Sequence, residues 1–265
     1  MASFSIVSNV SAKNAQANLN TTNIGLQKAL GRLSSGFRIN QAGDDAAGLA
    51  VANGYRSDQA VLNQGIRNAN DGLSTLQIQN GALDNISTLL DRLSTLASQS
   101  ASSGFTGSRT TLNSEFSSVV SEISREVSVA GLGTAQGFSV YVSSGTGGTV
   151  GGSIGAADTT TLGINALDIS TGTGAAAAVT AITSAVSAVG AVVGNVGAIQ
   201  NRLTYAVGLA QSQVVNKNAA ESRIRDANVA EESANLTRYQ ILTQSGIASL
   251  AQANQSSSAV LKLLG

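Results

Sequence analysis

Two adjacent carboxylates, Asp44 and Asp45, within RLSSGFRINQAGDDAAGLA, come closest in this sequence to a chemical site. A carboxylate pair could hold a hard cation or move a proton, but a cation needs several more oxygen ligands. The following segment, AAGLAVANG, offers few. An Asp before such a segment is a good helix N-cap, and a second acid suits the first turn. We therefore predict capping rather than a metal site.

Other catalytic chemistry is restricted by composition. Cys and His are both absent, which excludes thiolate nucleophiles, Ser-His-Asp triads, zinc sites and disulfides. The stretch from Gly172 to Ala177 matches GxGxxA, but no charged residue occurs between Asp168 and Arg202 to supply the acid that a dinucleotide site needs. We predict no catalytic residue, no cofactor and no enzymatic activity.

The elements that position these residues are predicted to be long helices. The 265 residues contain no proline, so nothing interrupts a helix, and only 3% are aromatic. The net charge is zero and no block of Lys or Arg occurs, so we expect no nucleic-acid partner. The first twenty residues lack a basic region followed by an apolar one, so we expect no cleaved secretory signal.

The N-terminal part carries two apolar seams of the coiled-coil kind. The first has spacings of seven, four, three and four residues and consists of Leu19, Leu26, Leu30, Leu33 and Phe37. The second steps by seven and consists of Leu76, Leu83, Leu90 and Ala97, with Ile86 and Leu93 between them. After the loop 100–108 the pattern resumes from Leu112 to Ile123, so the helices on either side of the loop should pack antiparallel.

The middle of the chain changes character. Residues 131–174 include 12 glycines, and the segment FSVYV at 138–142 alternates like a strand. A second segment, 159–170, is rich in β-branched residues. We predict short hairpins and loops here.

The C-terminal part resumes the helical pattern. Its most regular seam consists of Ile182, Val186, Val189, Val193, Val196, Leu203, Val207, Ala210 and Val214. Asp226 is then predicted to cap a final helix, with Glu231 and Glu232 favouring its dipole. The apolar residues of that helix are Leu236, Ile247, Leu250, Leu261 and Leu264.

The uncharged span 169–201 is long enough to cross a bilayer. It is rich in small residues, lacks aromatic anchors and keeps the heptad, so we expect a closely packed protein helix and no membrane insertion. Between the first two helices, Gly36 and Gly43 should let the chain turn, while Arg38 and the two aspartates supply polar contacts.

Several segments resemble the paired end regions of bacterial flagellin. The resemblance covers roughly residues 1–130 and 190–265, in the order expected of that family. The matching segments include NLNTTNIGLQKALGRLSSGFRINQAGDDAAGLAVA, IRNANDGLSTLQIQNGAL, GAIQNRL, ESRIRDANVAEESANLTRYQILTQSGIASLAQANQ and VLKLLG. The resemblance implies a structural subunit that polymerises into the helical flagellar filament for swimming.

The resemblance also implies a mainly α fold of long antiparallel helices, with terminal helices paired as a coiled coil and a small β-hairpin and loop region in the middle. The implied inner-core regions are 1–43, a helix with its connecting segment, and 226–265, a second helix. The implied helical rod consists of 44–130 and 176–225, and the variable region between them is 131–175.

By the same resemblance, the chain leaves the cell through type III export and resides in the extracellular flagellum. Its implied partners are many copies of itself, an export chaperone, the filament cap and the hook-junction proteins. The Toll-like receptor that senses flagellin is a further implied partner, through Arg92, Leu96 and Glu115. An equally good interpretation of Arg92 and Glu115 is a pair of charges on adjacent helices.

Two alternatives to a filament subunit stay open from the sequence. A flagellin-like protein of the hook–filament junction would share the terminal helices. A secreted adhesin or membrane-active protein would account for the Gly/Thr-rich middle and the uncharged span.

Overall fold

The structure is a computed structural model that describes residues 9–143, 145 and 147–263, with side chains as far as Gln255. Its elements confirm the predicted mainly α fold with one small hairpin. They are α1 (Val10–Ser35), α2 (Ala46–Ala101), α3 (Arg109–Ala130), β1 (Gln136–Tyr141), β2 (Thr149–Ile154), α4 (Gly172–Arg225) and α5 (Val229–Leu263). The chain forms two compact units, one of residues 1–57 and 216–265 and one of residues 58–215.

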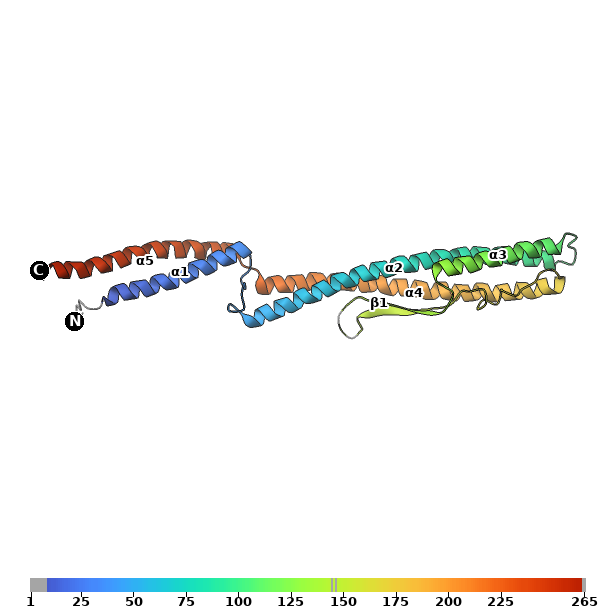
Figure 1. Ribbon diagram of the computed structural model, residues 1–265, viewed down its shortest axis with the longest axis horizontal. Helices are drawn as coiled ribbons and strands as arrows, with labels where there is room; N and C mark the ends of the chain where they lie inside the picture. The colour runs from blue at the N-terminus through green and yellow to red at the C-terminus, as the bar shows by residue number, and fades with distance from the viewer. Residues whose placement is uncertain (1–8, 144, 146, 264–265) are drawn as a thin grey trace. The chain divides into compact units, whose positions relative to one another are not determined.

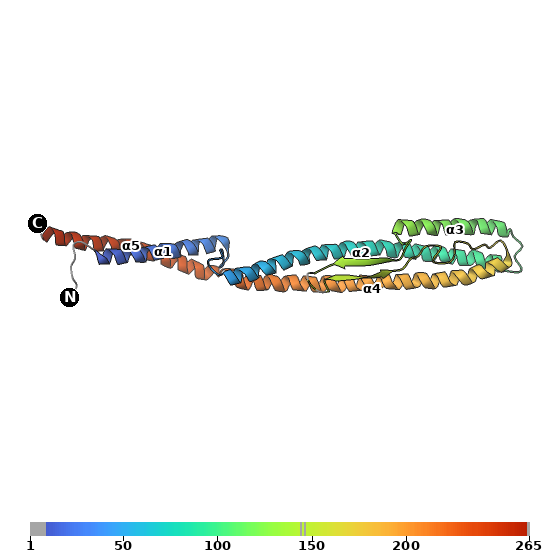
Figure 2. The same ribbon diagram turned by 60° about the horizontal axis from the view of Figure 1, so that its bottom comes forward.

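The second unit is built on α2, which lies beside α3 and α4 in both views of the ribbon (Figures 1 and 2). The buried side chains of α2 recur every seven residues, as predicted, and they belong to one hydrophobic core. This stripe consists of Leu62, Ala69, Leu76, Leu83, Leu90 and Ala97. The predicted seam of α2 is therefore confirmed.

The turn between α2 and α3 is fixed by side-chain hydrogen bonds. Arg109 donates to the carbonyl oxygens of Ser100 and Ser102 at 2.9 and 3.0 Å, and the Ser108 hydroxyl accepts from the N–H of Thr111. Capping satisfies the first N–H groups of α3, which otherwise lack helical partners. The helices on either side of the loop run antiparallel, as predicted (Figure 1).

The seam of α4 differs from the prediction at one position. Ala185 is buried, whereas the larger Val186 is 40% exposed. Val189, Val196 and Leu203 lie in the core, as predicted. A small residue at the contact lets the helix approach its neighbours closely, and the next residue is rotated about 100° away from that contact.

The hairpin pairs β1 with β2 in antiparallel register from Gln136 opposite Ile154 to Tyr141 opposite Thr149. The first strand overlaps the predicted segment, but its partner is β2, and 159–170 contains turns instead. Asp158 organises one of these turns. Hydrogen bonds from the hydroxyl of Thr161 foremost, and from the backbone N–H groups of Thr160 and Thr161, lower the pKa of Asp158.

Two glycines of α2 make room for this hairpin. A methyl group added at Gly65 would overlap the carbonyl oxygen of Val142, and one added at Gly72 would lie 2.8 Å from a methyl carbon of Val140. From α4, Arg202 donates to the carbonyl oxygen of Gly151 at 2.6 Å. The hairpin is therefore held by close packing of its backbone against α2 and by the hydrogen bond from Arg202 of α4.

We expect Gly65→Ala to destabilise the second unit by about 2 kcal/mol or more, because the overlap with a backbone atom requires the strand to move. Gly81→Ala is the matched control, since Gly81 lies in the same helix with open space around it. That change should stabilise the unit by about 0.5–1 kcal/mol. Urea unfolding of the two variants measures both effects, and equal midpoints would contradict the close approach.

Candidate functional site

Helices α1 and α5 of the first unit lie side by side and antiparallel (Figures 1 and 2). Their facing residues are partly or fully buried, and they recur every three or four positions. On α1 they are Ala12, Ala15, Leu19, Thr22, Leu26, Ala29 and Leu33. On α5 they are Glu232, Leu236, Tyr239, Thr243, Gly246, Leu250 and Ala253. These fourteen residues are called the terminal seam.

Glycines open the terminal seam at two places. A methyl group added at Gly25 would lie 2.6 Å from ring carbons of Tyr239, and one added at Gly246 would lie 3.1 Å from a methyl carbon of Leu19. Each large side chain therefore fills a space that only glycine leaves. Near the far end of the pair, the side-chain amide of Asn9 donates to the carbonyl oxygen of Ala253 at 3.0 Å.

The structure places the predicted terminal residues in two different environments. Leu19, Leu26, Leu33, Leu236 and Leu250 lie in the terminal seam. Leu30 and Ile247, in contrast, are 47% and 56% exposed, because Ala29 and Gly246 occupy the facing positions. The predicted place of Leu30 in the α1 seam was therefore wrong, and Ile247, one of the apolar residues noted in α5, also lies outside the terminal seam. Leu261 lies in α5 without a described side chain, and Leu264 lies outside the described residues.

One ion pair crosses the terminal seam where α1 ends and α5 begins. A guanidinium nitrogen of Arg32 donates to a carboxylate oxygen of Glu232 at 3.0 Å, and the two side chains are 31% and 10% exposed. Sequence analysis missed Arg32 and took Glu232 only as a dipole partner. The one signal in the sequence is that Glu232 has the same heptad position as Tyr239 and lies four residues before Leu236, on the apolar side of the helix, where an acid is unusual.

The connections that follow α1 and precede α5 are hydrogen-bonded to each other. Phe37 and Asp226 form an antiparallel bridge. The N–H of Arg38 donates to the carbonyl oxygen of Arg225 at 2.6 Å, and that of Ala227 donates to Gly36 at 2.9 Å. Gly36 has a φ of 74°, a conformation that other residues rarely adopt. The two breaks in the helices therefore occur side by side.

Side chains reinforce this joint and correct two predictions. Phe37 is outside α1 and stacks under the guanidinium of Arg225, 4.0 Å from the ring centroid, so it does not extend the α1 seam. Arg38 also donates from its side chain to the carbonyl oxygen of Ile224 at 2.9 Å. Asp226 does not cap α5. Asn228 does so, accepting from the N–H of Ala230 at 3.2 Å.

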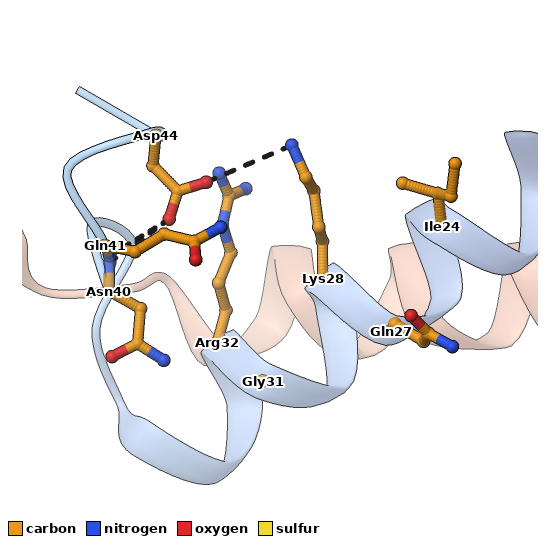
Figure 3. A pocket seen from close by; sticks show the side chains of 8 residues that line it. All are labelled: Ile24, Gln27, Lys28, Gly31, Arg32, Asn40, Gln41 and Asp44. Atoms are coloured by element: carbon orange, nitrogen blue, oxygen red, sulfur yellow. Dashed lines mark hydrogen bonds and ion pairs between the residues drawn. The ribbon is translucent and has the colours of Figure 1, made fainter.

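The two aspartates of the joint have separate tasks. Asp45 caps α2, accepting from the N–H of Gly48 at 2.9 Å. Asp44 accepts from the N–H groups of Asn40 and Gln41, both at 3.3 Å, and lies 4.0 Å from the ammonium of Lys28 (Figure 3). Its carboxylate thus closes the turn that leads into α2.

Gly43 lies in this turn with a φ outside the left-handed region and open space around it, so the conformation there does not require glycine. A hollow of about 500 Å³ separates the turn from α1 and is lined by Ile24, Lys28, Arg32 and Asp44 among others (Figure 3). Across the described part of the chain, no group of three or more acidic, Cys or His side chains could hold a metal ion.

The three residues of the implied receptor patch lie in the second unit, and the structure separates them by burial. Arg92 of α2 donates from its Nε to a carboxylate oxygen of Glu115 of α3 at 3.0 Å, and both side chains are partly exposed. Leu96 is buried in the core. Arg92 and Glu115 therefore join two adjacent helices at the surface, while Leu96 packs beneath.

Comparisons with known proteins agree on one family. The model of the bacterial flagellin N-terminal helical region matches residues 6–132, and that of the C-terminal helical region matches residues 179–264. The flagellin of Halalkalibacterium halodurans is 38% identical, covering 97% of this chain and 98% of its own. Flagellin FlaB1 of Treponema pallidum is 35% identical, with the same coverage of both chains.

Among solved structures, the crystal structure of Bacillus cereus flagellin is 24% identical, with a TM-score of 0.49 over 58% of this chain and 94% of that chain.

We expect Gly25→Ala to weaken the pairing of α1 with α5, because the ring of Tyr239 fills the space that the methyl group would need. Gly31→Ala is the control, since Gly31 lies in the same helix with nothing within 4 Å of an added methyl group. Amide hydrogen exchange of α1 and α5 should be faster in Gly25→Ala and no faster in Gly31→Ala. Unchanged protection in Gly25→Ala would show that Tyr239 can move aside.

Proposed function

The chain belongs to the bacterial flagellin family, and from this we propose that its copies join through the paired helices α1 and α5 and through the apolar side chains beside the terminal seam. It is a structural subunit of the flagellar filament, which many copies form outside the cell, and it is not an enzyme. The relatives that match nearly the whole chain are flagellins, so a hook–filament junction protein is not favoured.

The observation that carries the proposal is the set of apolar side chains that point away from the terminal seam. Ile24 and Leu30 of α1, and Ile241 and Ile247 of α5, are all exposed. The seam itself contains mostly small or polar residues, so it buries little apolar area within one chain. Contact with other copies would remove the exposed side chains from water and add the missing stabilisation, which couples folding of the ends to assembly.

Helix α4 supports the same proposal. It is long and apolar enough to cross a membrane, with a mean hydropathy of 1.9 in its most apolar window. One of its faces lies in the core of the second unit through Ile182 and Val196, whereas Val186, Tyr205 and Leu209 are exposed. We assign the exposed face to contact with neighbouring copies rather than with lipid, because small residues on it allow close approach of helices.

The domain division and the further partners rest on family membership. We propose that 1–43 and 226–265 form the inner pair, that 44–130 and 176–225 form the surrounding rod, and that 131–175 lies outside. The export chaperone, the filament cap and the junction proteins are proposed partners, with type III export as the route out of the cell.

Recognition by the Toll-like receptor is a separate proposal, supported by the exposure of Arg92 and Glu115. We expect Arg92→Ala to lower receptor signalling several-fold in reporter cells, because it removes an exposed charge. Arg125→Ala is the control, since the Arg125 side chain is 56% exposed and that of Arg92 is 52% exposed. Equal signalling by the two variants would leave Arg92 with a purely intramolecular role.

The assembly surface is tested at Leu30, whose replacement by Gln keeps a good helix former but removes apolar area. We expect the critical concentration for filament formation to rise at least tenfold. Tyr141→Gln serves as the control because Tyr141 is 48% exposed, much as Leu30 is, and lies in the hairpin of the proposed outer region. Electron microscopy and sedimentation measure the result, and equal critical concentrations would refute the proposed surface.

A further inference from the structure

The terminal seam on its own specifies the alignment of α1 and α5 weakly. Alanine and threonine occupy many facing positions, and such residues pack about equally well after a shift of one heptad. Coiled coils with apolar seams commonly rely on a few polar or size-matched positions to fix their register. A single register therefore requires positions in the terminal seam that discriminate between alignments.

Three contacts depend on the alignment. Tyr239 fills the space at Gly25, Leu19 fills the space at Gly246, and Arg32 pairs with Glu232. The residue numbers of each pair have nearly the same sum, as expected for one antiparallel register. The glycine contacts favour that register by shape, and the ion pair favours it by charge.

The ion pair discriminates most strongly, because Glu232 is nearly buried. A shift of one heptad would move Glu232 opposite Gly25 in one direction, or past the end of α1 in the other. Either shift leaves its carboxylate without the guanidinium of Arg32. A nearly buried charge that loses its partner is strongly unfavourable, whereas a formed pair contributes little net stability. The pair thus penalises wrong alignments more than it stabilises the right one.

We propose that Arg32 and Glu232 are positioning residues that select the register of α1 and α5, and that they pair within a single chain. This rests on the proposed function, in which the paired ends join copies in the filament. Pairing within one chain follows from the joint. The backbone bridge between Phe37 and Asp226 holds the end of α1 beside the start of α5, only a turn or so away from the ion pair.

Charge reversal tests the proposal. Arg32→Glu and Glu232→Arg should each raise the critical concentration for filament formation at least tenfold, and the chain carrying both changes should recover most of the loss. Arg125→Glu is the control, since it makes the same change of charge at an ion pair exposed on both sides. Urea unfolding of the second unit, monitored alongside, should be the same in the unchanged chain and in the variants of Arg32 and Glu232, which lie in the first unit.

Mixing the two single variants tests whether the pair forms within one chain. In an equimolar mixture, Arg32→Glu and Glu232→Arg chains should keep the raised critical concentration of the single variants, because no single chain carries a matched pair. A critical concentration of the mixture close to that of the unchanged chain would overturn pairing within a chain and indicate exchange of helices between copies. Normal polymerisation of either single variant alone would overturn the role of the ion pair in assembly.

The natural absence of cysteine allows the register to be read directly. Thr22→Cys with Thr243→Cys places thiols at facing positions, whereas Ala29→Cys with Thr243→Cys places them one heptad apart. Under mild oxidation only the first pair should form a disulfide, and Arg32→Glu should shift cross-linking toward the second. An unshifted cross-linking pattern would overturn the role of the ion pair in selecting the register.

The cross-linking experiment does not require polymerisation. Failure of the unchanged chain to form filaments would therefore count against the proposed function and leave the register proposal unaffected.

Discussion

Small side chains at the helix contacts are the constraint on which the rest of this structure depends. Ala29, Ala185 and Gly246 occupy facing positions, and the next residue in each case is larger and points outward. A close helix contact gains dispersion from many atoms but removes little apolar area from water. The same choice that lets the helices approach therefore leaves Leu30, Val186 and Ile247 exposed. A chain of this kind is completed by other copies of itself.

The sequence predicted the long helices and the buried stripe of α2 well, for physical reasons. No proline interrupts a helix, and large apolar residues recur every seven positions in α2, so the spacing and the size of the side chains indicate the same buried face. In the terminal helices the spacing and the size of the side chains do not indicate the same face. The seam predicted for α1 passes through Leu30, and the spacings 26, 30 and 33 alternate by four and three as regularly as 26, 29 and 33 do by three and four. The period alone therefore did not separate Leu30 from the smaller Ala29. Residue size was the wrong criterion where contacts are narrow.

The joint and the hairpin show what a single sequence does not contain. Strand β2 is rich in glycine, so its composition indicates a loop, and only its pairing with β1 makes it a strand. Asp44 and Asp45 were correctly expected to make structural contacts, but their division into a turn and a cap depends on the exact first residue of α2. The bridge between Phe37 and Asp226 joins residues far apart in the chain, and no local sequence pattern predicts it.

Register links these features to the filament. Because neighbouring positions on a helix differ by about 100° in direction, the outward side chains of α1 and α5 form a common surface only when the two helices keep one alignment. The joint brings the helix ends together, the glycine spaces accept Tyr239 and Leu19, and the pair of Arg32 with Glu232 disfavours shifted alignments. A chain with weak apolar burial can therefore still present a single surface to its neighbours, because specificity comes from a few matched positions rather than from the strength of the seam.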